Sequence, residues 1–265
     1  MTRVLKSIFV ALVFSFLAAP IIVVLGVSLN QPKRLLFPPE GLSLRWYGAL
    51  FRESDWLGAL QNSLIIATCA ALLAVSLALP LALHVWKRKG WMARALYSLG
   101  VAPFILPPVI SALGFMIFWI STGFYGRIEA TIISHAIFLV TLPLVTISLG
   151  LQSVNEELLE AARSMGADAR TTFRTVTFPL VRPYLVSGFA FAFVLSLNEY
   201  IISYMVSGFT VETLPIKIFN SLRYGYTPIM AAVAVSFVAL AAIVFGLIAR
   251  FGDLPRLLGA ERASR

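Results

Sequence analysis

The 265-residue sequence has few charged residues and a single cysteine, and each shortage excludes a class of protein. Asp, Glu, Lys and Arg make up 12% of the chain, about half the share usual in soluble globular domains. Cys69 alone can form neither an intramolecular disulfide nor a cysteine-rich metal site. The Gly-Lys dipeptide of phosphate-binding loops is absent, and no strand-like run precedes a G-x-G-x-x-G motif. We therefore expect a chain that hydrolyses no nucleotide and holds no metal.

Long apolar runs dominate what is present, since 59% of the residues are hydrophobic. A bilayer core about 30 Å thick takes roughly 20 helical residues. Six runs free of Lys and Arg reach that length, and none alternates apolar and polar residues as membrane barrel strands do. The sequence predicts an all-α membrane protein, one six-helix domain over residues 1–265. The predicted spans are Ile8 to Ser28, Ser63 to Trp86, Leu99 to Ile120, Ile132 to Leu151, Leu185 to Val206 and Ile229 to Ala249.

The first run is interpreted as an uncleaved anchor, because it is longer than a signal-peptide core and Pro20 follows its small residues. With six spans both termini lie on one side of the membrane. Fourteen of the 21 Lys and Arg also fall on that side, which the positive-inside rule makes the cytoplasm. No basic stripe with interleaved aromatics indicates nucleic-acid binding. The fourteen are Arg3, Lys6, Lys87, Arg88, Lys89, Arg94, Arg163, Arg170, Arg174, Arg182, Arg250, Arg256, Arg262 and Arg265.

The first and fourth loops are long and differ in kind. The first, Leu29 to Asn62, is rich in turn residues and is predicted to be irregular and external, with Trp46 and Tyr47 at the membrane interface. The fourth, residues 152–184, is predicted to be cytoplasmic. An amphipathic loop of this kind fits a lipid surface as well as a partner protein.

The fourth loop carries the signals of two short helices. Asn155 is a good N-cap, and Gly166 is expected to end the first helix in a left-handed conformation. Asp168 is expected to cap a second helix through Val176, which Pro179 ends. The sequence therefore predicts a helix, a tight turn and a helix before the fifth span.

The order Glu160-Ala161-Ala162, Gly166, Val176 and Phe178-Pro179 resembles the E-A-A-x3-G-x9-I-x-L-P signature of ABC importer permeases, with Val176 in place of Ile and Phe178 in place of Leu. Other segments resemble the spermidine/putrescine permease C branch of that family. They are Asn62-Ser63-Leu64, Pro107-Pro108-Val109, Ser134-His135, Phe193 to Glu199, and Thr213 to Ile218.

The resemblance implies a bacterial inner-membrane importer in which two permease subunits form the path. Two ATPase subunits, which hold ATP and Mg, dock on the EAA loops, and an external solute-binding protein delivers the substrate. This chain would supply one half of the path and bind no cofactor itself. Without the resemblance, Glu160 and Arg163 are an ordinary i,i+3 surface pair. The residues it assigns to ATPase coupling are Glu160, Ala161, Ala162, Arg163, Gly166 and Pro179.

Glu199 is the most costly residue inside a predicted span, at on the order of 3 kcal/mol if it inserts charged. Asn198 adjoins it and Ser203 lies one helical turn along, so the three predict either a substrate pathway or a structural contact between helices. In the polyamine branch this stretch usually resembles an acidic pair. Asn198 in place of one acid weakens the case for a multiply charged polyamine and leaves room for a monoamine, an amino-phosphonate, an opine or another small solute, while a polyamine or related amine stays the first choice.

The aromatic residues Trp119 and Tyr125 near the end of the third span are interpreted as interface anchors or as a cation-binding wall on the pathway. His84 and His135 have no second ligand at metal-site spacing and are predicted to be packed or interfacial. The prolines of the third span predict a kink or unwound turn there.

Two other functions remain possible on the sequence. A self-sufficient secondary transporter would use Glu199 as an ion site, but no convincing internal repeat is present. An intramembrane enzyme would need a paired nucleophile and base at membrane depth, and the spans offer one acid and two distant histidines.

Overall fold

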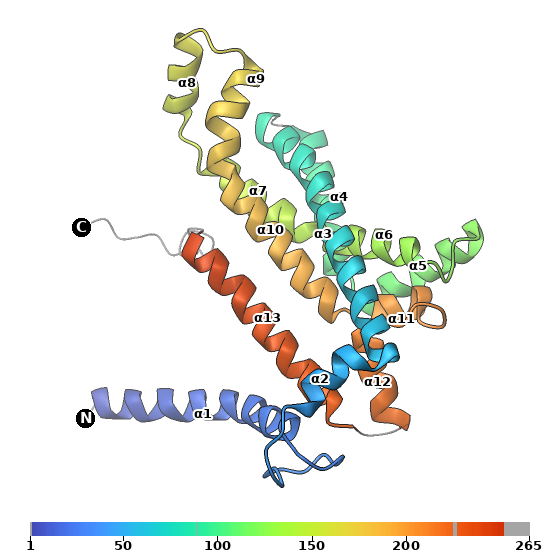
Figure 1. Cartoon of the computed structure of the whole chain (residues 1–265). Helices are drawn as coiled ribbons and strands as arrows, with labels where there is room; N and C mark the ends of the chain where they lie inside the picture. The colour runs from blue at the N-terminus through green and yellow to red at the C-terminus, as the bar shows by residue number, and fades with distance from the viewer. Residues whose placement is uncertain (1, 89, 225–226, 252–265) are drawn as a thin grey trace.

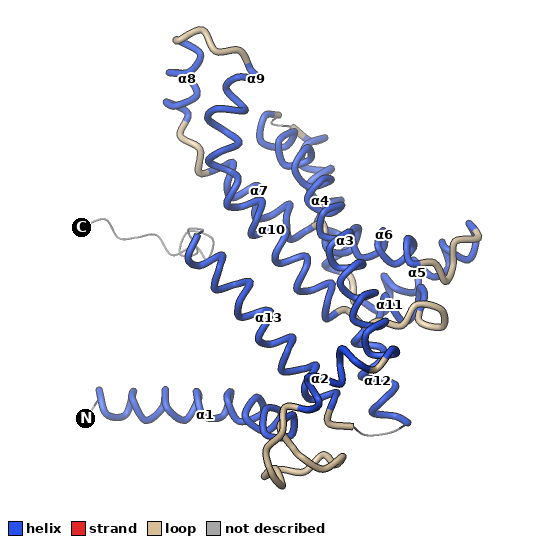
Figure 2. Tube along the Cα trace, viewed as in Figure 1, coloured by secondary structure: helices blue, strands red, loops and turns tan. Residues whose placement is uncertain are grey.

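The computed structural model describes residues 2–88, 90–224 and 227–251, and helices make up most of this part of the chain (Figures 1 and 2). Lys89, Arg256, Arg262 and Arg265, which entered the orientation argument, lie outside it. The helices are α1 (Thr2–Ser28), α2 (Arg45–Arg52), α3 (Ser54–Lys87), α4 (Trp91–Ile105), α5 (Pro108–Thr122), α6 (Ile128–Leu139), α7 (Thr141–Gln152), α8 (Glu156–Ser164), α9 (Ala169–Thr172), the π-helical turn Phe173–Thr177, α10 (Phe178–Asn198), α11 (Ile201–Ser207), α12 (Leu214–Tyr224) and α13 (Ile229–Phe251).

Four helical segments of the described chain are long and apolar enough to cross a membrane, and two bent pairs raise the number to six. The α4–α5 pair is bent by 104° and the α6–α7 pair by 42°. Six predicted spans therefore agree with the structure only if each bent pair is counted as one. The four unbroken segments are Val4–Ser28, Ser54–Lys87, Ala169–Asn198 and Ile229–Gly246.

The centre of the bundle is the pair α3 and α10, which pack against each other and against α7. A stripe of alanines at i, i+4 spacing, from Ala70 through Ala74 and Ala78 to Ala82, is fully buried on α3. Because alanine side chains are small, the backbones of neighbouring helices approach closely. In a membrane, where the hydrophobic effect does not hold helices together, this close van der Waals packing stabilises the bundle. Gly188 of α10 serves the same end, because a Cβ there would lie 2.7 Å from the Cα of Pro143 in α7.

Buried side chains form three clusters along the bundle. The first joins α2, the start of α3, α12 and α13. The second joins the middle of α3 to α5, α6, α11 and the end of α10. The third joins the end of α3 to α7, α8 and the start of α10. In Figure 1 the α8–α9 segment lies at one end of the molecule, and α2 and α12 lie at the other.

The prediction of an irregular loop over Leu29 to Asn62 is wrong for the second half of this range. Residues Arg45–Arg52 form α2, and α3 begins at Ser54, nine residues before the predicted start of the second span. Trp46 and Leu50, at i and i+4, are buried together with Trp56 in the first cluster. This packing stabilises a short helix where the turn-rich composition predicted none.

The kink expected in the third span is present. Pro103 lies inside α4, Pro107 is the N-cap of α5 and Pro108 is its first residue, where a proline is favourable. Leu106 is extended, with ψ 143°, so the run that reads as one span turns through the 104° bend.

Two boundaries around the fifth span are corrected by the structure. Pro179 does not end a helix, because the residues from Ala169 to Asn198 form one continuous helical segment. The π-turn before it places the N–H of Phe178 on the carbonyl of Phe173, and Pro179 sits in the first turn of α10. A local π-helical adjustment of this kind is one way in which a continuous membrane helix tolerates a proline that lacks an N–H. The fifth span ends at Asn198 rather than Val206, because Glu199 is extended.

Helix α1 is the least enclosed element. Its window of highest hydropathy has no buried residue, and among the other helices it packs mainly against α13 (Figure 1). An apolar helix with so little cover fits a lipid environment.

Candidate functional site

The first candidate site is the α8–α9 hairpin, defined here as residues 155–177. Asn155 accepts a hydrogen bond from the backbone N–H of Glu157 at 2.9 Å and so caps α8. Asp168 accepts one from the N–H of Thr171 at 2.8 Å and caps α9. Both caps lie where the sequence predicts them, and they satisfy amides that the start of a helix leaves unpaired.

Gly166 turns the chain between the two helices. Its φ is +83°, the left-handed conformation expected for it. The N–H of Gly166 donates to the carbonyl of Arg163 at 2.9 Å, and the N–H of Ala167 donates to the carbonyl of Ala162 at 3.0 Å. This pair of bonds is a Schellman motif. A Cβ on Gly166 would meet no atom within 4 Å, so only the backbone conformation restricts the residue.

The hairpin has a buried face and an exposed face. Ala162 is 6% exposed and Leu159 is 8% exposed, whereas Ala161, Glu160 and Arg163 are exposed. The family resemblance assigns both alanines to ATPase coupling, and the structure leaves only Ala161 exposed. The described ion pairs do not include one between Glu160 and Arg163.

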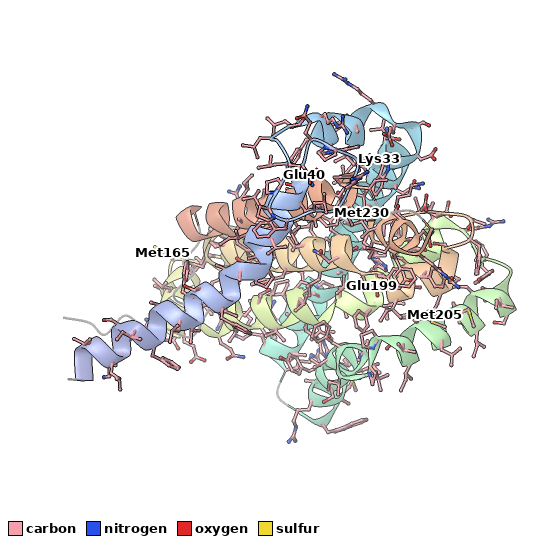
Figure 3. All side chains as sticks on the ribbon, turned by 90° about the horizontal axis from the view of Figure 1, so that it is seen from below. Lys33, Glu40, Met165, Glu199, Met205 and Met230 are labelled. Atoms are coloured by element: carbon pink, nitrogen blue, oxygen red, sulfur yellow. The ribbon has the colours of Figure 1, made fainter. Side chains whose placement is uncertain are left out.

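The exposed face of α8 is partly apolar. Leu158 is 49% exposed and Met165 is 84% exposed, and with Ala161 they follow each other at helical spacing. In Figure 3, Met165 lies at the edge of the molecule. Exposed apolar residues at the tip of a hairpin are typical of a contact surface.

Hydrogen bonds stabilise the charged form of the Asp168 side chain. Hydrogen bonds from the hydroxyl and then the backbone amide of Thr171 hold the pKa of Asp168 below its usual value. Because they favour the carboxylate, the cap of α9 is complete at neutral pH.

The second candidate site is the break between α10 and α11. Glu199 follows the last residue of α10, and its carboxylate turns onto the start of α11. Oε1 accepts from the N–H of Ile202 at 2.9 Å, and Oε2 accepts from the N–H of Ser203 at 3.0 Å. Glu199 is 10% exposed and lies among the helices in Figure 3. The acid predicted inside the fifth span therefore caps a helix start within the bundle.

His135 of α6 is only 1% exposed and contacts this cap. Its Nε2 lies 3.2 Å from Oε2 of Glu199 and 2.9 Å from the hydroxyl of Ser203. Its Nδ1 lies 2.7 Å from the hydroxyl of Ser196 in α10. The packed histidine predicted from the sequence is confirmed, but the carboxylate beside it was missed.

Further hydroxyl contacts extend this network. Thr131 of α6 and Ser207 of α11 lie with their hydroxyls 2.6 Å apart. Trp119 of α5 donates from its indole N–H to the hydroxyl of Ser134 at 2.8 Å. We call the whole set the polar cluster, and its members are Trp119, Thr131, Ser134, His135, Ser196, Glu199, Ser203 and Ser207.

Asn198 lies on another side of the break. Its side-chain amide donates to the carbonyl of Val194 at 2.8 Å, which leaves Oδ1 as an acceptor. With Tyr200 it lines a cleft of about 490 Å³ between α12 and α13, called here the Asn198 cleft. The rings of Tyr200 and Phe219 lie 4.8 Å apart in its wall, and those of Tyr200 and Tyr204 are stacked. Tyr200 had no part in the sequence prediction, although its place directly after Glu199 was a signal for it.

The remaining predicted residues lie apart from the Asn198 cleft. Trp119 is buried and hydrogen-bonded, which disagrees with an interface anchor, and Tyr125 is exposed in the turn after α5. His84 lies in the last turn of α3. In the described part of the chain, no three His, Cys, Asp or Glu residues gather as metal ligands.

The sequence and the overall fold match one group of transport proteins. Residues 70–253 match the family described as the binding-protein-dependent transport system inner membrane component. The chain belongs to this family, the permease subunits of ABC importers.

Named relatives and solved structures agree. The chain is 32% identical to the putrescine transport system permease protein PotI of Escherichia coli (strain K12), over 98% of this chain and 96% of that protein. It is also 32% identical to the spermidine/putrescine transport system permease protein PotC of Haemophilus influenzae, over 89% and 91%. A bacterial ABC transporter involved in alginate import shares the fold, with a TM-score of 0.71, 15% identity and coverage of 95% and 96%. The methionine ABC transporter MetNI also shares the fold, with a TM-score of 0.64 and 18% identity, over 83% of this chain and 100% of that chain.

Proposed function

We propose that this chain is one half of the membrane path of an ATP-driven importer for a small amine. Two separate ATPase subunits supply ATP hydrolysis with Mg, a second permease subunit completes the path, and an external binding protein delivers the solute. Both termini and the α8–α9 hairpin face the cytoplasm in this proposal, as the distribution of Lys and Arg favours.

The observation that carries the ATPase contact is the exposed face of the hairpin. Leu158, Ala161 and Met165 present apolar surface on a helix whose ends are fixed by a cap and a Schellman motif. A rigid element of this kind can transmit the movement of a partner, whereas a flexible loop cannot. Glu160 and Arg163 flank this face and act at the same contact, and Gly166 sets its direction. Pro179 lies in the first turn of α10, which carries the movement into the bundle.

The observation that favours an amine is the composition of the Asn198 cleft. The carbonyls at the end of α10 carry the negative end of the helix dipole, and Asn198 adds the free oxygen of its amide. The faces of Tyr200 and Phe219 attract an ammonium group by cation–π interaction. Half-helix ends of this kind hold cations in other transporters with broken helices. The names of the polyamine permeases that the chain resembles agree with this choice.

An amino-phosphonate is the second candidate substrate. The chain is 29% identical over 236 residues to a putative 2-aminoethylphosphonate transport system permease protein, PhnV, of Salmonella paratyphi A. The neutral amide of Asn198 suits a solute that carries one amine and one anionic group. In competition assays on the reconstituted importer, excess 2-aminoethylphosphonate blocks putrescine uptake only if this second candidate is correct.

The coupling assignment is tested with Gly166→Val in the complete importer. A β-branched residue in the left-handed region is strained, so the hairpin changes direction. We expect the ATPase subunits to be lost on purification, or uptake to fall at least about tenfold at normal permease levels. Gly58→Val in α3 is the matched control, because an added Cβ there meets no atom within 4 Å and its φ is ordinary. Normal uptake by Gly166→Val would refute the assignment.

A further inference from the structure

The polar cluster joins helices that are far apart in the sequence. The bonds from His135 to Ser196 and to Ser203 span 61 and 68 residues, and the bond from Thr131 to Ser207 spans 76. All of these side chains are buried. Together they attach α6 to both sides of the break between α10 and α11.

One tautomer of the neutral imidazole satisfies every contact around His135. With the proton on Nε2, the ring donates to the hydroxyl of Ser203 and toward Oε2 of Glu199, and Nδ1 accepts from the hydroxyl of Ser196. The hydroxyl of Ser203 then donates to the backbone carbonyl of Glu199 at 3.3 Å. The carboxylate of Glu199 receives two backbone amides and the imidazole.

These bonds leave the carboxylate of Glu199 with little capacity to bind a solute. Three of the roughly four acceptor positions of a carboxylate are occupied, and the side chain is 10% exposed. The Asn198 cleft is lined by the residues on either side, Asn198 and Tyr200, and Glu199 is not part of its lining.

We propose that Glu199 is a positioning residue which, with His135, fastens the α10–α11 break to α6, so that α6 and α11 move as one body during transport. The carboxylate holds the start of α11 in place and does not contact the solute. Substrate selection then depends on Asn198 and its aromatic neighbours. The proposal rests on the proposed function only through the use of uptake as a readout.

The first test measures KM and maximal rate of putrescine uptake by the reconstituted importer with its binding protein. We expect Glu199→Gln and His135→Gln each to lower the maximal rate about tenfold, to leave KM within about twofold, and to have no larger effect together than singly. Ser148→Ala is the control, because its buried hydroxyl has no partner in the described structure. A rise in KM of about tenfold or more for Glu199→Gln, with normal kinetics for His135→Gln, would overturn the proposal.

A second test does not depend on the identity of the solute or on the stability of the Glu199 variants. Thr131→Cys and Ser207→Cys are combined with Cys69→Ala, and the cysteines are crosslinked in the resting importer and in the importer trapped with ADP and vanadate. We expect equal crosslinking in both states and retention of ATPase stimulation by the binding protein. Failure to crosslink, crosslinking in only one state, or loss of stimulation that a reductant restores would each overturn the proposal. Absence of putrescine uptake by the unmodified importer would instead count against the proposed substrate.

Discussion

The α8–α9 hairpin and the polar cluster are built by opposite means. Hydrogen bonds in the hairpin join residues two to five positions apart, and its outer face is exposed. In the polar cluster, the bonds of His135 and Thr131 join different helices, and the side chains that make them are buried. A substitution on the exposed face of the hairpin is therefore expected to change binding to a partner protein. A substitution in the polar cluster is expected to change how firmly the helices are held together.

The largest effect on stability is expected from removing the buried acid. Glu199→Leu leaves the N–H groups of Ile202 and Ser203 without acceptors and His135 without its carboxylate. We expect a loss of about 2–4 kcal/mol in the free energy of unfolding, measured on the purified complex in detergent. Glu160→Leu is the matched control on the exposed hairpin, and its effect is expected to stay within about 0.5 kcal/mol. Equal losses would contradict the contrast between the two regions.

The two adjacent alanines sharpen the contrast within the hairpin itself. Ala162→Trp overfills a buried position and is expected to cost about 1–3 kcal/mol of stability. Ala161→Trp adds its ring to the exposed face, so it is expected to leave thermal unfolding unchanged and to abolish ATPase binding. Thermal scans and co-purification measured on both variants separate the effects. The prediction is wrong if Ala161→Trp retains the ATPase.

Trp119→Phe is expected to have a smaller effect. It keeps an aromatic ring in the second cluster but loses the hydrogen bond to Ser134 and part of the packed volume of the indole. In a membrane bundle such a bond is worth about 0.6 kcal/mol. Uptake kinetics serve as the second measurement, with KM expected to be unchanged. A clear change in KM would support the cation-binding wall that the sequence also allowed.

The smallest effect is expected from pH acting on the hairpin. The pKa of Asp168 lies below its usual value near 3.8, so its cap is fully present above that value and is lost only as the pH falls through the lowered pKa. Between pH 5 and pH 8 ATPase binding should therefore not depend on this residue. Asp168→Asn keeps a capping oxygen and is expected to bind normally across that range. Weaker binding at pH 5 by the native chain alone would contradict this.

Local signals made the hairpin predictable from the sequence. Asn155, Gly166 and Asp168 each act on backbone groups a few residues away, so their structure follows from residue type and spacing. The six apolar runs were predictable for the same reason, because hydropathy is a local property. The burial of Ala162 and the π-turn at the end of the hairpin did not follow from these local signals.

Long-range contacts made the other features hard to predict. Glu199 was found by its cost in a membrane, but nothing near it in sequence indicated His135 as its partner. The spacing of Glu199, Ser203 and Ser207 by four residues does suggest one polar helix face, and Thr131 and His135 repeat it on α6. The helix α2 and the continuous helix past Pro179 also depend on tertiary packing and on the π-turn, which composition does not reveal.

The π-turn Phe173–Thr177 has a consequence for insertions and deletions. A single wide turn accommodates one surplus residue without changing the angular phase of the helical segments on either side. Removing one residue from Phe173–Thr177 should therefore leave the orientation of Met165 relative to Asn198 unchanged. Removing one residue from the regular part of α10 would rotate one end against the other by about 100°. Within the helical segment from Ala169 to Asn198, tolerance to length changes is thus concentrated in one turn.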